Sequence, residues 1–114
     1  MFTLNWGVVD AGKVVCFKTG ISAKPPDGHY LRVTGRSGLS AKGIVVLTGV
    51  VDPDYTGDIQ IMVHNTTDQV FHVPAGYKIA QMIPERYASE CQVQVISSLP
   101  SGARGSKGFG SSGY

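Results

Sequence analysis

Short apolar runs separated by glycine- and proline-containing turns limit this chain to one class of fold. Residues 44–47 (Ile-Val-Val-Leu) read as a fully buried strand, whereas residues 58–65 alternate polar and apolar side chains. The sequence Asp-Pro-Asp-Tyr-Thr-Gly at residues 52–57 is a strong turn signal. Only residues 37–42 could form a single helical turn. The pattern therefore predicts an all-β fold, a sandwich or barrel, without internal repeats.

The further strands that the pattern predicts are residues 14–17, 21–24, 29–33, 70–73, 77–83 and 91–96. Residues 97–103 read as a linker. We expect two parts: a β-barrel domain at residues 1–103 and a glycine- and serine-rich segment at residues 104–114.

Length and composition exclude several classes of protein. A chain of 114 residues forms one domain and buries roughly two-thirds of its unfolded surface. A net charge of +2 does not suggest a nucleic-acid binder, and no apolar run is long enough to span a membrane. Cys16 and Cys91 lie among apolar neighbours, lack metal or redox spacing, and are expected to be buried free thiols. With no secretion signal, we expect a soluble intracellular protein, cytoplasmic or nuclear.

The segment at residues 104–114 cannot build a core, but its composition suits an anionic ligand. Glycines let the backbone approach phosphate oxygens, serine hydroxyls donate to them, and Arg104 adds a bidentate charge. Phe109 could stack on a flat ring, and a flat ring with phosphates is the outline of a nucleotide. Taken alone, a segment of this composition is far more often just a flexible terminus.

Two internal turns and one polar residue add to this chemistry. At residues 35–43, Arg36 and Ser37 among glycines suit phosphate oxygens, although such a turn is often a plain surface turn. Residues 49–57 read as a hairpin between two apolar strands, where Asp52 could stand at the mouth of a pocket and activate a water. Asp54 fits a turn-stabilising role. Gln81 interrupts an apolar strand, and either satisfies a backbone group or faces a polar ligand.

Taken together, these segments resemble the trimeric deoxyuridine triphosphatase (dUTPase) family. Residues 35–39 (Gly-Arg-Ser-Gly-Leu) resemble the second family motif, residues 49–57 the third, residues 76–81 the fourth and residues 104–113 the fifth. The resemblance covers about residues 13–114. It implies a homotrimer of distorted jelly-roll-like β-barrels with a glycine-rich C-terminal lid. The implied activity is hydrolysis of dUTP to dUMP and pyrophosphate, which limits uracil incorporation into DNA and supplies dUMP.

The resemblance also implies a role for each site residue. Asp52 would position the attacking water, Tyr55 would lie against the deoxyribose, and Phe109 would cover the uracil. Mg²⁺ would be held by the triphosphate and waters, with no protein metal ligands. The implied substrate-binding residues are Arg36, Ser37, Gly38, Gly49, Val50, Tyr55, Gln60, Gln81, Arg104, Phe109, Gly110, Ser111 and Ser112.

The chain departs from the family at the first motif, where Val14 and Val15 follow Ala11-Gly12-Lys13 and the expected acid is missing. The first-motif region is therefore expected to be shortened. Loss of such an acid, which in the family supports the waters on Mg²⁺, commonly lowers metal affinity or activity by about 10–100-fold. Lys78 replaces the usual arginine, which keeps the charge but loses the bidentate geometry. The alternatives are a nucleotide-binding or regulatory module of the same fold, with a protein partner and weak or no catalysis, and a dCTP deaminase.

Overall fold

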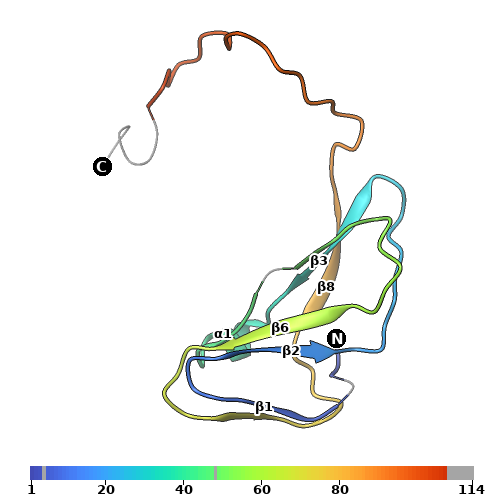
Figure 1. The fold of residues 1–114 in the computed structure, drawn as a ribbon, viewed down its shortest axis with the longest axis vertical. Helices are drawn as coiled ribbons and strands as arrows, with labels where there is room; N and C mark the ends of the chain where they lie inside the picture. Colours follow the sequence, from blue (N-terminus) through green and yellow to red (C-terminus); the bar gives the residue numbers. More distant parts are fainter. Residues whose placement is uncertain (4, 48, 108–114) are drawn as a thin grey trace.

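A computed structural model describes residues 1–3, 5–47 and 49–107, and places short strands and one helical turn within them (Figure 1). The all-β prediction is confirmed. In chain order the elements are β1 Gly7–Val9, β2 Val14–Lys18, β3 His29–Thr34, α1 Ser37–Ser40, β4 Ile44–Val46, β5 Gly49–Val51, β6 Gln60–Asn65, β7 Phe71–Val73 and β8 Gln81–Arg86.

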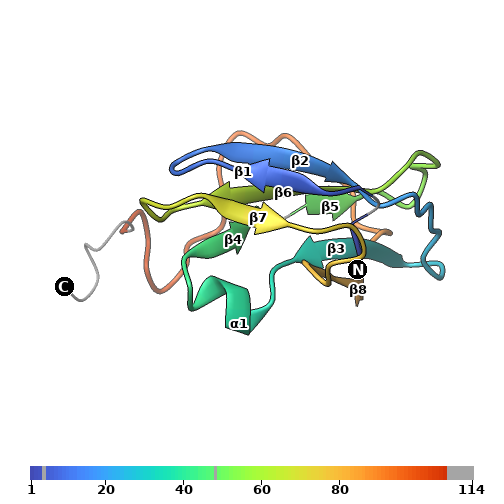
Figure 2. The ribbon, with the colours of Figure 1, turned by 90° about the horizontal axis from the view of Figure 1, so that it is seen from below.

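The described strands pair antiparallel in three small sheets, ordered β1-β7, β2-β6-β4 and β5-β3-β8. Figure 2 shows β1, β2, β6 and β7 on one side of the barrel and β3 and β8 on the other. Alternation in β6 directs Ile61 and Val63 inward and Gln60 and Met62 outward. Pro84 lies in β8 at an edge of its sheet, where a missing N–H is tolerated.

The core lies between these layers and is aliphatic apart from one phenylalanine. Strands far apart in sequence contribute to it, because each gives only one face to the interior. Its buried members are Val9, Phe17, Leu31, Val33, Leu39, Ile44, Val46, Ile59, Ile61, Val63, Val73, Ile79 and Ala80. No helix among the described residues is long and apolar enough to cross a membrane.

Residues 88–107 leave the barrel as an extended arm (Figure 1). The radius of gyration is 18.8 Å, whereas a compact domain of this length has about 13 Å. The strand predicted at residues 91–96 is wrong for the isolated chain. Its alternation is present, but no partner strand pairs with it in the part of the chain described here, and Val93 and Val95 are 99% and 95% exposed.

Several other sequence-based expectations need correction. Both cysteines are free, but Cys16 lies on the outer face of β2 and Cys91 on the arm, so both are exposed rather than buried. Residues 21–24 form no strand. In the strand predicted fully buried at residues 44–47, Ile44 and Val46 are buried but Leu47 is 37% exposed. Two strands, β1 and β5, were not predicted as such, because each begins with glycine and has only two apolar residues, too few to stand out as an apolar run.

Candidate functional site

The turn between β3 and β4 presents the second-motif residues to solvent. The helical turn predicted within residues 37–42 is confirmed as α1, which buries Leu39 and leaves Arg36, Ser37 and Gly38 exposed. Apart from its chain neighbours and the backbone of its own helical turn, no described atom lies within 4 Å of the position where a Cβ would stand on Gly38. A ligand can therefore approach this turn closely, and it meets a guanidinium and a hydroxyl there.

The fourth-motif residues are brought to the same end of the sheet by the pairing of β3 with β8. Thr34 lies opposite Gln81 in this ladder, and Gln81 Nε2 donates to the carbonyl of Gly35 at 2.7 Å. Gln81 is exposed, so it satisfies a backbone group without being a buried amide. Arg36 Nη1 donates to the carbonyl of Lys78 at 2.9 Å, which ties the two motifs together.

Positive charge gathers at this end of the molecule. Lys78 Nζ lies 5.7 Å from the centroid of the Phe2 ring, and the Met1 amino group donates to the carbonyl of Ala80 at 2.6 Å. Burial lowers the pKa of this amino group, and the positive charges of Arg36 and Lys78 lower it further. Within the described residues the ion pair that forms is Arg32–Glu85, so neither Arg36 nor Lys78 is paired with a carboxylate there. We call the group Arg36, Ser37, Gly38, Lys78 and Gln81 the cationic end.

The third-motif residues lie in a loop of residues 52–59 that joins β5 to β6. The predicted turn is confirmed by a hydrogen bond of 3.0 Å from the N–H of Tyr55 to the carbonyl of Asp52. Asp52 and Tyr55 are both exposed. A groove of about 320 Å³ runs beside the loop between residues 22–24 and 53–56, and Asp52 does not line it. We call residues 52–59 the acidic loop.

The acidic loop does not close a simple hairpin, as the sequence had suggested. Its first strand, β5, pairs with β3, and its second strand, β6, pairs with β2 and β4. The outer face of β6 begins with Gln60, whose Oε1 accepts a hydrogen bond from the Cys16 thiol at 2.9 Å. Gly49 and Val50, two more of the expected substrate-binding residues, lie on β5, with Val50 63% exposed.

Within one chain, the cationic end and the acidic loop lie at opposite ends of β3. Val51 pairs with Leu31 near the start of β3, whereas Arg36 follows the end of the strand at Thr34. By this register Asp52 stands level with Tyr30, six positions before Arg36, so a rise of about 3.3 Å per residue separates the two by about 20 Å along the sheet. Figure 1 shows α1 and the acidic loop at opposite ends of the barrel. The chain alone does not bring these two groups together.

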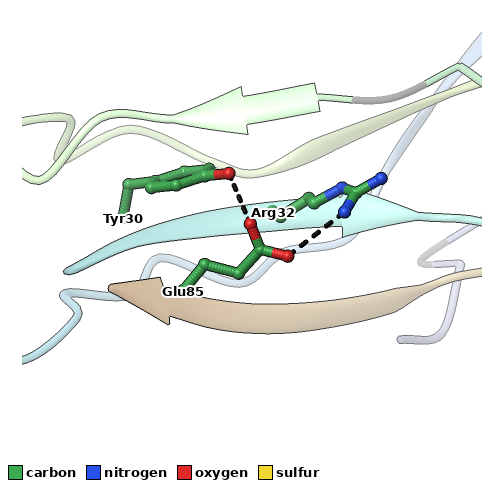
Figure 3. A network of polar contacts seen from close by, with 3 residues as sticks. All are labelled: Tyr30, Arg32 and Glu85. Carbon is green, nitrogen blue, oxygen red and sulfur yellow. Dashed lines mark hydrogen bonds and ion pairs between the residues drawn. The ribbon is translucent and has the colours of Figure 1, made fainter. Parts of the chain in front are cut away.

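A polar network that the sequence did not single out lies on the face between them (Figure 3). Tyr30 Oη donates to Glu85 at 2.5 Å, and Arg32 Nη1 donates to the other oxygen of Glu85 at 3.2 Å. The hydrogen bond from Tyr30, followed by that from Arg32, lowers the pKa of Glu85, and the same contact raises the pKa of Tyr30. The network cross-links β3 to β8, the two strands that flank the cationic end.

Two hydroxyl side chains beside the acidic loop, Thr19 and Ser22, were also not singled out. Their only sequence signal is a hydroxyl directly after an apolar strand and a second one three residues on. Arg104 is exposed on the arm, in a turn where the N–H of Gly105 donates to the carbonyl of Gly102 at 3.1 Å. The expected lid residues Phe109, Gly110, Ser111 and Ser112 lie outside the described residues.

Comparison with known proteins identifies the family to which these motifs belong. The sequence profile of the dUTPase family matches residues 6–113. The chain is 43% identical over 107 residues to the deoxyuridine 5'-triphosphate nucleotidohydrolase of Paramecium bursaria Chlorella virus 1, covering 93% of this chain and 75% of that protein. It is 42% identical over 108 residues to the enzyme of the same name from Kluyveromyces lactis, covering 94% and 73%.

The fold agrees with this match. The structure superposes on the Staphylococcus bacteriophage 80alpha dUTPase solved with dUPNHPP with a TM-score of 0.89 and 25% identity, covering 99% of this chain and 83% of that one. The jelly-roll-like architecture inferred from the sequence motifs is thereby confirmed. On the extent of the profile match and the identity to its relatives, this chain belongs to the dUTPase family.

Proposed function

We propose that this chain hydrolyses dUTP to dUMP and pyrophosphate. The observation that carries the proposal is its 42–43% identity to two deoxyuridine triphosphate nucleotidohydrolases over more than nine-tenths of its length. The exposed residues of the cationic end and the acidic loop supply the groups such a reaction needs: cations and hydroxyls for phosphates, and a carboxylate for a water.

Asp52 is the group proposed to handle the water. Its carboxylate would accept the water proton while the water oxygen attacks the α-phosphorus and the bond from that phosphorus to the bridging oxygen breaks, releasing pyrophosphate. The turn hydrogen bond from the N–H of Tyr55 to the carbonyl of Asp52 fixes the start of the loop in which both proposed residues lie.

The cationic end is proposed to hold the triphosphate. Arg36 offers a fork-shaped set of donors, and the Ser37 hydroxyl and Gln81 amide add neutral ones, which together suit phosphate oxygens rather than a metal ion. Among the described residues no group of three or more His, Cys, Asp or Glu could hold a metal. The proposed Mg²⁺ would thus be bound through the triphosphate and waters, as this ion commonly is, and would neutralise developing phosphate charge.

We further propose that the active molecule is a homotrimer whose sites form between subunits. The separation of Asp52 from Arg36 within one chain supports this, since a second copy has to supply the missing half of each site. The exposed Val93 and Val95 on the arm support it as well, because such an alternating segment needs a partner to bury its apolar face. Arg104 and the expected lid residues, Phe109 to Ser112, would then close over a neighbour's site and exclude water.

The first test is pyrophosphate release from dUTP by the purified protein, with and without Mg²⁺, using dCTP, dTTP and UTP as controls. We expect release from dUTP alone. Ammonia release from dCTP would instead identify a deaminase. Binding of dUTP without any pyrophosphate would indicate a binding or regulatory module and would refute the hydrolase.

The trimer and its shared sites have a separate test. Light scattering after size exclusion should give three times the chain mass of 12.1 kDa. Arg36→Ala and Asp52→Ala should each be nearly inactive alone, whereas co-expression should restore part of the turnover. Restoration is expected because mixed trimers contain some sites with Asp52 from one subunit and Arg36 from another. No restoration in mixed trimers would show that each site is built within one chain.

A further inference from the structure

The acidic loop is not held by pairing between its own flanking strands. Its two flanking strands, β5 and β6, belong to different sheets, so the two ends of the loop diverge. In an ordinary hairpin the ladder of cross-strand hydrogen bonds fixes the loop that joins the strands. Some other part of the molecule must fix residues 57–59, and the hydrogen bonds identify it.

That part is the segment directly after β2. The N–H of Ile59 donates to the carbonyl of Ile21 at 2.8 Å. The Thr19 hydroxyl donates to the carbonyl of Ile59 at 2.6 Å and accepts from the N–H of Ile21 at 3.1 Å. Thr19 is 7% exposed and Ile59 2% exposed, so water has little access to replace these bonds. The Thr19 hydroxyl therefore joins the segment after β2 to the acidic loop at the point where that loop enters β6.

A second contact continues this anchor toward Tyr55. Ser22 Oγ donates to the carbonyl of Gly57 at 3.0 Å, and Tyr55 Oη donates to the carbonyl of Asp58 at 2.7 Å. The Tyr55 ring also packs on Gly57, where an added Cβ would stand 2.5 Å from the phenolic oxygen. The position of this ring is thus set by the main chain of residues 57 and 58, which Ser22 and Thr19 hold from outside the loop.

We propose that Thr19 is a positioning residue that determines selectivity for deoxyribonucleotides, assisted by Ser22. The inference rests on the proposed function, in which the Tyr55 ring lies against the sugar. A ring that rejects a 2′-hydroxyl by contact has to be held in place, since a small displacement makes room for one oxygen atom. Thr19 touches no substrate in this scheme and acts only through the main chain of Ile59 and its neighbours.

The test compares turnover of dUTP and UTP in matched variants. Thr19→Val keeps the shape of the side chain but removes the hydroxyl, and we expect the ratio of kcat/KM for dUTP over UTP to fall about tenfold. Thr19→Ser keeps the hydroxyl and should restore the ratio to within about threefold of the wild type. Ser22→Ala, at an exposed position, should lower the ratio by about threefold.

Thr67→Val is the matched control. The Thr67 hydroxyl likewise accepts from a backbone N–H, that of Gln69 at 3.2 Å. It donates to Asn65 Oδ1 at 2.7 Å, with a longer contact of 3.1 Å to the carbonyl of Gln69. It lies beyond the opposite end of β6, at Asn65, so it is far from the acidic loop. Thr67→Val should leave the ratio unchanged. An equal fall in Thr67→Val and Thr19→Val would overturn the proposal in favour of a general loss of stability.

The remaining outcomes also test the role of Thr19. An unchanged ratio in folded Thr19→Val overturns the proposal, and if that variant does not fold, an unchanged ratio in Ser22→Ala does so. Hydrogen exchange at the Ile59 amide, measured without nucleotide, should be faster in Thr19→Val than in Thr67→Val, and equal rates would overturn the anchor. If the wild type does not hydrolyse dUTP, the proposed function fails, and the ratio of binding constants for dUTP and UTP replaces the turnover ratio.

Discussion

The side chain of Asn65 should be among the largest single contributors to the stability of this protein. It is 0% exposed, and all of its polar capacity is used. Its Nδ2 donates to the carbonyls of Val9 at 2.9 Å and Gln69 at 2.6 Å. Its Oδ1 accepts from the N–H of Thr67 at 3.0 Å and from the Thr67 hydroxyl at 2.7 Å. These bonds join the end of β6 to β1 and to the turn before β7.

Replacement of this residue by alanine removes all four hydrogen bonds at once. The carbonyl of Val9 accepts a buried hydrogen bond from the side-chain amide of Asn65. Leaving such a buried carbonyl unsatisfied costs about 1–3 kcal/mol. The turn groups at Thr67 and Gln69 can bond to water instead, so each of their bonds contributes about 0.5–1 kcal/mol. Asn65→Ala should therefore lower the free energy of unfolding by about 3–5 kcal/mol. That is a large fraction of the about 5–15 kcal/mol that holds a domain folded.

Urea unfolding followed by far-ultraviolet circular dichroism measures this loss, with all proteins at one chain concentration because association adds to apparent stability. Asn5→Ala, at an exposed asparagine, is the control and should change stability by less than about 0.5 kcal/mol. Asn65→Asp keeps the shape but turns an oxygen toward the carbonyls of Val9 and Gln69, so it should be destabilised at least as much at neutral pH. A loss below about 1 kcal/mol in Asn65→Ala would refute the reasoning from satisfied buried amides.

Three further outcomes are expected. Asp52→Asn should abolish pyrophosphate release while dUTP still binds in calorimetry, because the proton acceptor is lost and the phosphate clamps remain; undiminished turnover would exclude Asp52 as the base. Deletion of residues 104–114 should lower turnover severely and leave the mass in light scattering at that of the trimer, and dissociated chains would show that the segment is structural. Glu85→Gln should destabilise the protein near neutral pH. The hydrogen bonds from Tyr30 and Arg32 hold the folded-state pKa of Glu85 below its unfolded value, so their stabilisation is present above about pH 4.3 and is lost as pH falls through the folded-state pKa. The difference in unfolding free energy between Glu85→Gln and the wild type should therefore shrink on acidification, and a difference independent of pH would contradict the assignment.

Local sequence was sufficient for the class of fold because strand formation depends on short-range alternation and on turns. The alternation at residues 58–65 predicted β6 nearly to its ends, and the turn at residues 52–57 was located correctly. Prediction from local sequence failed where the alternating pattern was present but a partner strand was not. Residues 91–96 alternate as a strand does, yet a strand forms only beside another strand that takes up its backbone hydrogen bonds.

The candidate site shows the same division between what local sequence predicts and what tertiary contacts decide. The residue types at Arg36, Ser37 and Asp52 led to the proposed chemistry, because phosphate binding demands cations and hydroxyls and activation of a water demands a base such as a carboxylate. Their distances from one another could not be predicted, since pairing of Val51 with Leu31 sends Asp52 to the end of β3 away from Arg36.

The sequence by itself determined the all-β class, the family and the residues proposed to carry the chemistry, because these depend on side-chain type and on spacing over a few positions. Only the tertiary structure decided that β5 and β6 belong to different sheets, that Cys16 faces outward, and that the Thr19 hydroxyl fixes the end of the acidic loop. These features depend on contacts between residues far apart in the chain, such as Thr19 with Ile59. No local pattern encodes such a contact, because the competing strand pairings that it excludes have the same local sequence.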